Sequence, residues 1–226
     1  MHIWIAGDSW ATPNYFNPIP GWRAKGHVSE LLADDGHTIF NFGWNGESNL
    51  QSFYQSTSHH EDYIGRPDVV IWFHTSLVRD YTSWTHMIEP ADCILHQIDN
   101  AAKVVYSEVE QILKNAGNPE LIVIEGHGKI IQSEFDKHFD PLLYVKNWRG
   151  QICGVTDCHP HFVSESINIT GVTSLDEQEL EQLVADIERV QDAMHHDMFP
   201  DFSHPGDIPH QELYTKIQQA LRRINK

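Results

Sequence analysis

The sequence contains no apolar run that approaches the roughly 20 residues a helix needs to cross a bilayer. Its first residues also lack a basic segment, an apolar region and a cleavage site, and they read directly as a strand. These absences predict a protein without a transmembrane segment or a signal peptide. We therefore expect it in the cytoplasm or, if it is virus-encoded, inside the infected cell.

Basic residues and cysteines are both scarce. The chain has 15 Lys and Arg against 32 Asp and Glu, and its formal net charge is −17. Such a surface repels phosphate backbones and anionic headgroups, so we expect no nucleic-acid and no membrane partner, and neutral substrates fit better. The odd set of three cysteines forms no obvious disulfide framework and fits a reducing compartment: Cys93, Cys153 and Cys158.

Internal repeats, low-complexity tracts and linkers are also missing, which indicates one domain over residues 1–226. Apolar strand patterns alternate with amphipathic helical ones, which is typical of an α/β fold with a mostly parallel sheet of about five strands, covered by helices on both faces in a three-layer sandwich. The expected strands are 3–6, 38–42, 69–73, 121–125 and, more weakly, 151–155. The expected helices are 28–33, 98–116, 174–194 and 209–224.

Two segments between these elements are rich in aromatic side chains. Residues 10–22 carry four of them among three prolines, and residues 77–96 add Tyr81 and Trp84. Both segments leave the edge of the sheet where parallel strands end, so they are candidates for the walls of a pocket. The alternative is that each loop folds onto its own hydrophobic residues.

The first strand ends in Gly7-Asp8-Ser9, a tight turn with a hydroxyl at its tip. Near the other end of the chain, Asp201 and His204 stand three positions apart. A neutral imidazole can take the proton of a serine hydroxyl, and a carboxylate on its other nitrogen fixes the tautomer. This pattern therefore predicts a nucleophile, a base and an orienting acid. The plainer interpretation is that Asp201 caps a helix and His204 lies on the surface.

A second Asp-x-x-His occurs at Asp207 and His210 and competes for the same role. We prefer Asp201 and His204, because this pair precedes the last helix. His210 would instead lie in the first turn of that helix.

Three motifs resemble those of the SGNH hydrolases, also called the GDSL-like lipase and esterase family. They are Gly-Asp-Ser at 7–9, Asn-Phe-Gly-Trp-Asn-Gly at 41–46 and Asp-x-x-His-Pro at 201–205. They occur in the family's order and at similar spacing over the whole chain. The resemblance implies a flavodoxin-like fold and a serine esterase without a cofactor.

The resemblance also implies a role for each motif. Ser9 corresponds to the nucleophile, His204 to the base and Asp201 to its orienting acid. The backbone N–H groups of Ser9 and Gly46 correspond to donors of the oxyanion hole, the group of hydrogen-bond donors that stabilises negative charge on the reacting oxygen.

One motif departs from the family pattern. The family places an asparagine after its third strand as an oxyanion donor, whereas this chain has His74-Thr75-Ser76 there. Ser76 is the matching position, with Thr75 or Arg79 as alternatives, although Arg79 is more simply expected to pair with Asp80 or Asp68. Loss of one such donor typically costs ~10²–10³ in rate.

Sixteen histidines raise the question of a metal site. The densest group surrounds Pro160, with His159 and His161, but its spacing matches no zinc motif and favours a surface loop. We therefore expect no metal. His127 follows the fourth strand and Trp10 follows Ser9, so both are candidate pocket residues.

Together these observations predict a serine ester hydrolase that acts by acyl transfer through Ser9 on a small-molecule or glycan ester. Acetyl or acyl esters of a carbohydrate are one substrate class. The alternative is a catalytically weak or silent binding module for a glycan or a protein, for instance virus-encoded. The missing asparagine favours this alternative.

Overall fold

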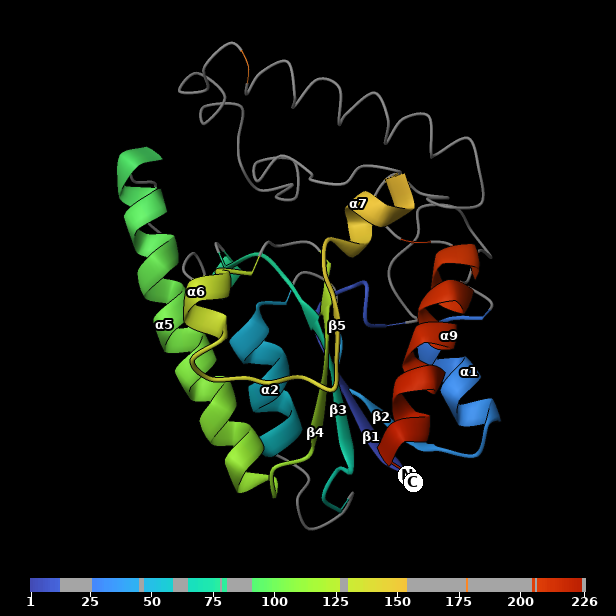
Figure 1. Ribbon diagram of the computed structural model, residues 1–226. Helices are drawn as coiled ribbons and strands as arrows, with labels where there is room; N and C mark the ends of the chain where they lie inside the picture. The colour runs from blue at the N-terminus through green and yellow to red at the C-terminus, as the bar shows by residue number, and fades with distance from the viewer. Residues whose placement is uncertain are drawn as a thin grey trace.

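The computed structural model describes residues 1–12, 26–44, 47–58, 65–77, 79–80, 91–126, 130–153, 178, 205 and 207–224. Within them, a five-stranded sheet has helices on both faces (Figure 1). The strands are β1 (His2–Ala6), β2 (Thr38–Asn41), β3 (Val69–His74), β4 (Glu120–Glu125) and β5 (Leu143–Val145). The helices are α1 (Val28–Asp34), α2 (Asn49–Ser58), α5 (Ala91–Asn115), α6 (Gln132–Phe135), α7 (Trp148–Cys153) and α9 (Asp207–Ile224).

All pairs in the sheet are parallel, and the strand order is β2-β1-β3-β4-β5. This is the flavodoxin-like order, in which the chain moves to opposite sides of β1 for the next two strands. The point where the order reverses therefore lies between β1 and β3, at their carboxyl ends. The predicted α/β fold class is confirmed.

The buried strands are apolar on both sides because helices cover both faces of the sheet. Alternate side chains point to opposite faces. One set packs beneath α1, α7 and α9: Ile3, Ile5, Val69, Ile71, Phe73, Ile122, Ile124 and Val145. The other set packs beneath α2 and α5: Trp4, Ala6, Val70, Trp72, Leu121 and Val123.

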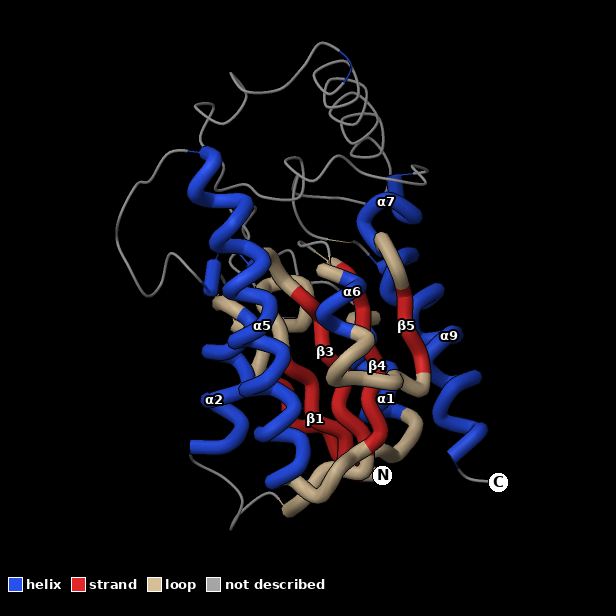
Figure 2. Tube along the Cα trace, turned by 60° about the vertical axis from the view of Figure 1, so that its left-hand side comes forward, coloured by secondary structure: helices blue, strands red, loops and turns tan. Residues whose placement is uncertain are grey.

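Each helix buries one apolar stripe, as its sequence period requires. Helix α9 contributes Leu213, Ile217 and Leu221 to the first layer, opposite α1. Helix α5 contributes Val105 and Val109 to the second layer, beside α2. Figure 2 shows the two pairs of helices on opposite sides of the sheet.

Most predicted elements lie where the sequence indicates them. Strands β1 to β4 match the four stronger predictions, and helices α1, α5 and α9 match theirs, although α5 begins earlier than expected. The predicted strand at 151–155 is wrong. Trp148 and Ile152 are instead buried one helical turn apart on α7, and the fifth strand is β5. The expected helix at 174–194 lies almost wholly outside the described residues.

Helix α2 has no counterpart among the sequence predictions. Ser48 caps it, because the Ser48 hydroxyl accepts a hydrogen bond from the backbone N–H of Gln51 at 3.3 Å. Ser-x-x-Gln is the signature of a capping box and is the signal that could have revealed this helix. Across the described part of the chain, no helix combines the length and apolar character needed to span a membrane.

Candidate functional site

Ser9 lies in a tight turn at the carboxyl end of β1. The turn is closed by a hydrogen bond from the backbone N–H of Ala11 to the carbonyl of Asp8 at 3.0 Å. Gly7 makes it possible: its φ is +146°, and an added Cβ would stand 2.7 Å from Cβ of Phe73. A residue with a side chain fits neither the backbone angle nor the space. The turn therefore places Ser9 at the switch point of the sheet.

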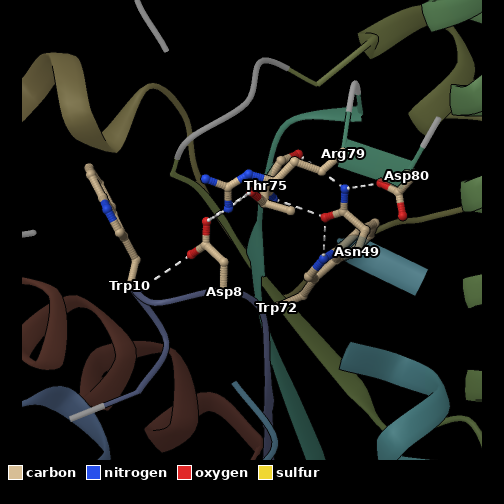
Figure 3. A network of polar contacts seen from close by, with 7 residues as sticks. All are labelled: Asp8, Trp10, Asn49, Trp72, Thr75, Arg79 and Asp80. Carbon is tan, nitrogen blue, oxygen red and sulfur yellow. Dashed lines mark hydrogen bonds and ion pairs between the residues drawn. The ribbon is translucent and has the colours of Figure 1, made fainter. Parts of the chain in front are cut away.

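The side chain of Asp8 holds this turn to the loop after β3 (Figure 3). Its Oδ1 accepts from the backbone N–H of Trp10 at 3.0 Å. Its Oδ2 accepts from the Thr75 hydroxyl at 2.8 Å and from Nη1 of Arg79 at 2.7 Å. Because Asp8 is almost fully buried, these donors and the paired charge are what make its burial tolerable.

This arrangement answers two questions about the loop after β3. Arg79 is paired with Asp8, not with the expected partners, since Asp68 accepts from the backbone of His2 and Asp80 from that of Leu50. Thr75 is fully buried and gives its one hydroxyl hydrogen to Asp8. A hydroxyl has a single hydrogen to donate, so the Thr75 side chain is already committed.

Asn49, the first residue of α2, is a residue of the candidate site that the sequence analysis missed. It is fully buried, and its amide makes four hydrogen bonds. Nδ2 donates to the Thr75 carbonyl at 3.1 Å and to Asp80 at 2.7 Å. Oδ1 accepts from the Trp72 indole at 3.1 Å and from the Thr75 backbone N–H at 2.9 Å. Asn49 thus fixes both sides of Thr75 and, with it, the position of the next residue, Ser76.

Asp80 completes this network from the other side of Asn49. Its Oδ1 accepts from the backbone N–H of Leu50 at 2.9 Å, at the start of α2. Burial raises the pKa of the Asp80 carboxyl, while its hydrogen bonds with Leu50 and Asn49 act in the opposite direction. Asp80 is therefore a structural anchor between α2 and the loop after β3.

The loop after β2 is fastened directly to the Ser9 turn. The Asn41 amide donates to the carbonyl of Ala11, and its oxygen accepts from the backbone N–H of Gly43 at 2.9 Å. An added Cβ at Gly43 would stand 2.6 Å from that of Ala11. At Gly43 only a glycine allows so close an approach. The first two motifs of the sequence analysis also meet directly, because the Trp44 backbone N–H donates to the Gly7 carbonyl at 3.3 Å.

Trp10 lies in the core, although it is a candidate pocket residue in the sequence. Its ring is 1% exposed and meets that of Trp148 edge-on, with ring centroids 5.4 Å apart. Its carbonyl lies 3.2 Å from Nε2 of His27. Since Nδ1 of His27 accepts from the backbone N–H of Ser29, Nε2 carries the hydrogen and donates it to Trp10.

His210, from the competing Asp-x-x-His pair, belongs to the same aromatic group. It is 1% exposed, and its ring centroid lies 4.2 Å from that of His27 and 5.5 Å from that of Trp148. Burial lowers the pKa of His210 well below its ordinary value, and the neighbouring His27 lowers it further. This packing is that of a neutral core histidine.

Glu125, at the end of β4, is a second residue that the sequence analysis passed over. Its two carboxylate oxygens accept from backbone N–H groups of Ile130 at 2.7 Å and Asn147 at 2.6 Å. It therefore ties the segment after β4 to the segment after β5, at the same edge of the sheet as Ser9.

The structure brings Ser9, Thr75, Ser76 and Arg79 to this edge. Apart from Trp10, which lies in the core, the other predicted site residues fall outside the described part of the chain: Gly46, His127, Asp201 and His204. Most of the two aromatic insertions and the His159–His161 group also fall outside it. In the part that is described, no cluster of His, Cys, Asp or Glu has the makings of a metal site.

No family model and no curated protein matches the sequence. Among solved structures, the psychrotrophic esterase EstA from Pseudoalteromonas sp. is 13% identical over 98% of each chain, with a TM-score of 0.49. The lipase/acylhydrolase from Enterococcus faecalis is 13% identical over 96% of this chain and 93% of its own, with a TM-score of 0.38. LAE5, an alpha/beta hydrolase from the metagenome of Lake Arreo, is 12% identical over 97% and 94%, with a TM-score of 0.44. At such identities the likeness concerns the fold, and the esterase and lipase names describe those proteins alone.

Proposed function

We propose that this protein is a serine ester hydrolase that transfers an acyl group through Ser9. In this mechanism His204 takes the proton from the Ser9 hydroxyl, and Asp201 orients the imidazole. The Ser9 oxygen attacks the ester carbonyl, and His204 returns the proton to the leaving alcohol. Water then releases the acid by the same steps, so that Ser9 and His204 are regenerated.

The observation that carries the proposal is the way the Ser9 turn is held. Gly7 fixes its backbone, and the buried Asp8 carboxylate ties it to Thr75 and Arg79. A nucleophile must be presented rigidly, because small misplacements of reacting groups cost large factors in rate. An ordinary surface turn would not require a buried ion pair to hold it.

We assign the oxyanion hole to the backbone N–H groups of Ser9 and Gly46, with the Ser76 hydroxyl as the side-chain donor. Ser76 is supported over Thr75 because the Thr75 hydroxyl hydrogen is bonded to Asp8. It is supported over Arg79 because that guanidinium is paired with the same carboxylate. Ser76 follows Thr75 directly, and the amide of Asn49 holds the Thr75 backbone.

For the substrate we propose an acyl ester of a carbohydrate. Trp44 follows Gly43, which packs against Ala11, and the Trp44 backbone N–H donates to the Gly7 carbonyl at 3.3 Å. Its side chain is nevertheless 68% exposed. An indole presented to solvent from an anchored backbone can stack on a sugar ring, and the net charge of −17 suits a neutral ligand.

Labelling with a fluorophosphonate probe tests the nucleophile. The wild type should react covalently at Ser9, and Ser9→Ala should lose both labelling and esterase activity while its melting temperature changes little, because alanine keeps the shape of the buried Ser9 side chain apart from one oxygen atom. Ser48→Ala is a matched control, since Ser48 is also buried but caps a helix. Undiminished labelling of Ser9→Ala would contradict the proposal. Acetylated sugars and p-nitrophenyl esters would then define the substrate.

The alternative is a binding module for a glycan or a protein that uses the same edge of the sheet. One observation favours it: two of the three candidate replacements for the family's asparagine, Thr75 and Arg79, are engaged with Asp8. Such a protein would bind an acetylated glycan without turnover and would leave the fluorophosphonate probe unreacted.

A further inference from the structure

Glu47 is a buried carboxyl group between the loop after β2 and helix α2. It follows Gly46 directly, and its backbone N–H donates to the Trp44 carbonyl at 3.3 Å. The residue is only 2% exposed. Its Oε1 accepts from the side-chain amide of Gln55, whereas its Oε2 is buried and has no hydrogen-bond partner among the described residues.

An ionised carboxylate is poorly accommodated in this position. Charged groups tolerate burial when cations or several donors surround them, and Glu47 has one neutral amide. Asp8, at the end of β1, is close enough to act on it electrostatically and carries the competing negative charge. Asp8 is itself stabilised by Arg79, Thr75 and the backbone of Trp10.

The two carboxyl groups therefore differ in which form they favour. Asp8 favours its ionised form, because the Arg79 guanidinium, the Thr75 hydroxyl and the Trp10 backbone N–H all face its carboxylate. Glu47 holds the proton, because burial and the charge of Asp8 both raise its pKa, to about 7. Helix α2 itself carries no acidic residue. Asp80, in the segment after β3, packs against the start of this helix, and its oxygens face Asn49 and Leu50.

We propose that Glu47 is a proton-controlled positioning residue of the Ser9 site. In its neutral form it adds no charge that acts on the Asp8 carboxylate, and it leaves the Ser9 turn undisturbed. When it loses its proton to solvent, a second negative charge acts on the buried Asp8 carboxylate that holds the Ser9 turn. The site is then in its working form only while Glu47 is protonated.

The consequence for catalysis rests on the proposed function. Ester hydrolysis builds negative charge on the carbonyl oxygen in the transition state, and Gly46 is one of its assigned donors. A charged Glu47 opposes that charge and destabilises the Asp8 carboxylate that holds the Ser9 turn, so kcat falls, whereas a neutral ester binds equally well and KM is little changed. His204 must be neutral to act as base. The pH profile should therefore be bell-shaped, with Glu47 setting its alkaline limb.

The first measurement needs no enzymatic activity. Glu47→Gln keeps the shape of the protonated acid but cannot ionise. Because folding raises the pKa of Glu47, the native state binds the extra proton between about pH 4.5 and 7, and stability falls as pH rises through this window. Relative to Glu47→Gln, the unfolding constant of the wild type should rise on the order of 50-fold between pH 5 and 8 in urea titrations. Glu212→Gln, an exposed change on α9, is the matched control and should track the wild type.

The second measurement is the pH profile of kcat on a neutral p-nitrophenyl ester. The wild type should lose about threefold or more of its kcat between pH 7 and 8.5, and Glu47→Gln should hold its kcat over this range with the acid limb unchanged. KM should stay within about twofold in both proteins.

The outcomes separate the two proposals. A wild type whose stability relative to Glu47→Gln does not depend on pH overturns the role of Glu47, whether or not the protein is an esterase. The expected dependence of stability in a protein without esterase activity supports the protonation of Glu47 and overturns the proposed function. An alkaline limb that persists unchanged in Glu47→Gln overturns the control of the reaction by this residue.

Discussion

At the scale of single residues, Thr75 and Ser76 are adjacent hydroxyl residues with different expected roles. The Thr75 hydroxyl donates to the buried Asp8 carboxylate, so Thr75→Val removes a charge-assisted hydrogen bond while keeping the shape of the side chain. We expect it to lower the free energy of unfolding by about 1–3 kcal/mol. Ser76→Ala should lower that free energy less than Thr75→Val does and should lower kcat about tenfold or more with little change in KM.

Urea unfolding together with steady-state kinetics on one substrate would check both variants. Arg79→Ala is the third comparison, because the guanidinium is paired with Asp8. A Ser76→Ala protein with wild-type kcat, beside a collapse in one of the other two, would move the side-chain donor to that residue.

At the scale of elements, the passage from β1 into the Ser9 turn depends on Gly7. An added methyl group would overlap both Cβ and the carbonyl oxygen of Phe73 on β3, at 2.7 and 2.8 Å, and the φ of +146° disfavours any side chain. Gly7→Ala should therefore lower the free energy of unfolding by about 3 kcal/mol or more, measured by urea denaturation.

Gly36, after helix α1, provides the control for this prediction. It also has a positive φ, of +85°, but an added Cβ there would meet no atom within 4 Å. Gly36→Ala should cost only the backbone strain, about 1 kcal/mol. Equal losses in the two variants would show that the contact with β3 does not matter.

At the scale of the whole molecule, His210 should make stability fall in acid. Burial lowers the pKa of His210 in the native state well below 6.5, so the unfolded chain binds the proton first as pH falls. Below about pH 6.5 stability should then decline by up to ~1.4 kcal/mol per pH unit from this group. His210→Leu should show a smaller decline between pH 7 and 5, measured by urea unfolding at each pH.

This effect has the opposite sign to that of Glu47, whose raised pKa costs stability as pH increases. The two groups lie in different layers of the fold, so the stability changes of the two variants should be independent of each other. The exposed His2 supplies the control, and His2→Gln should follow the wild type. A decline in acid that is identical in His210→Leu and the wild type would contradict the assignment to His210.

The sequence by itself determined the elements that local pattern controls. Apolar runs specify β1, β3 and β4 because both faces of a parallel sheet are covered, and the period of α5 and α9 specifies their buried stripes. Gly7-Asp8-Ser9 identifies the turn, because a sharp bend at a strand end needs a glycine. Short elements are harder to predict from the sequence. The strand β5 has only three residues. The sequence predicts a strand in place of the end of α7, because Gln151–Cys153 is too short to show a helical period.

Only the tertiary structure decided which side chains hold the site together. Thr75 and Arg79 meet Asp8 from positions 67 and 71 residues away, and Asn49 reaches Thr75 from 26 residues away. Such contacts leave no periodic or motif signal, since they depend on which strand ends the sheet order brings together. Burial likewise makes Glu47 and His210 unusual, because the charge a group keeps depends on the solvent it loses and the charges it meets.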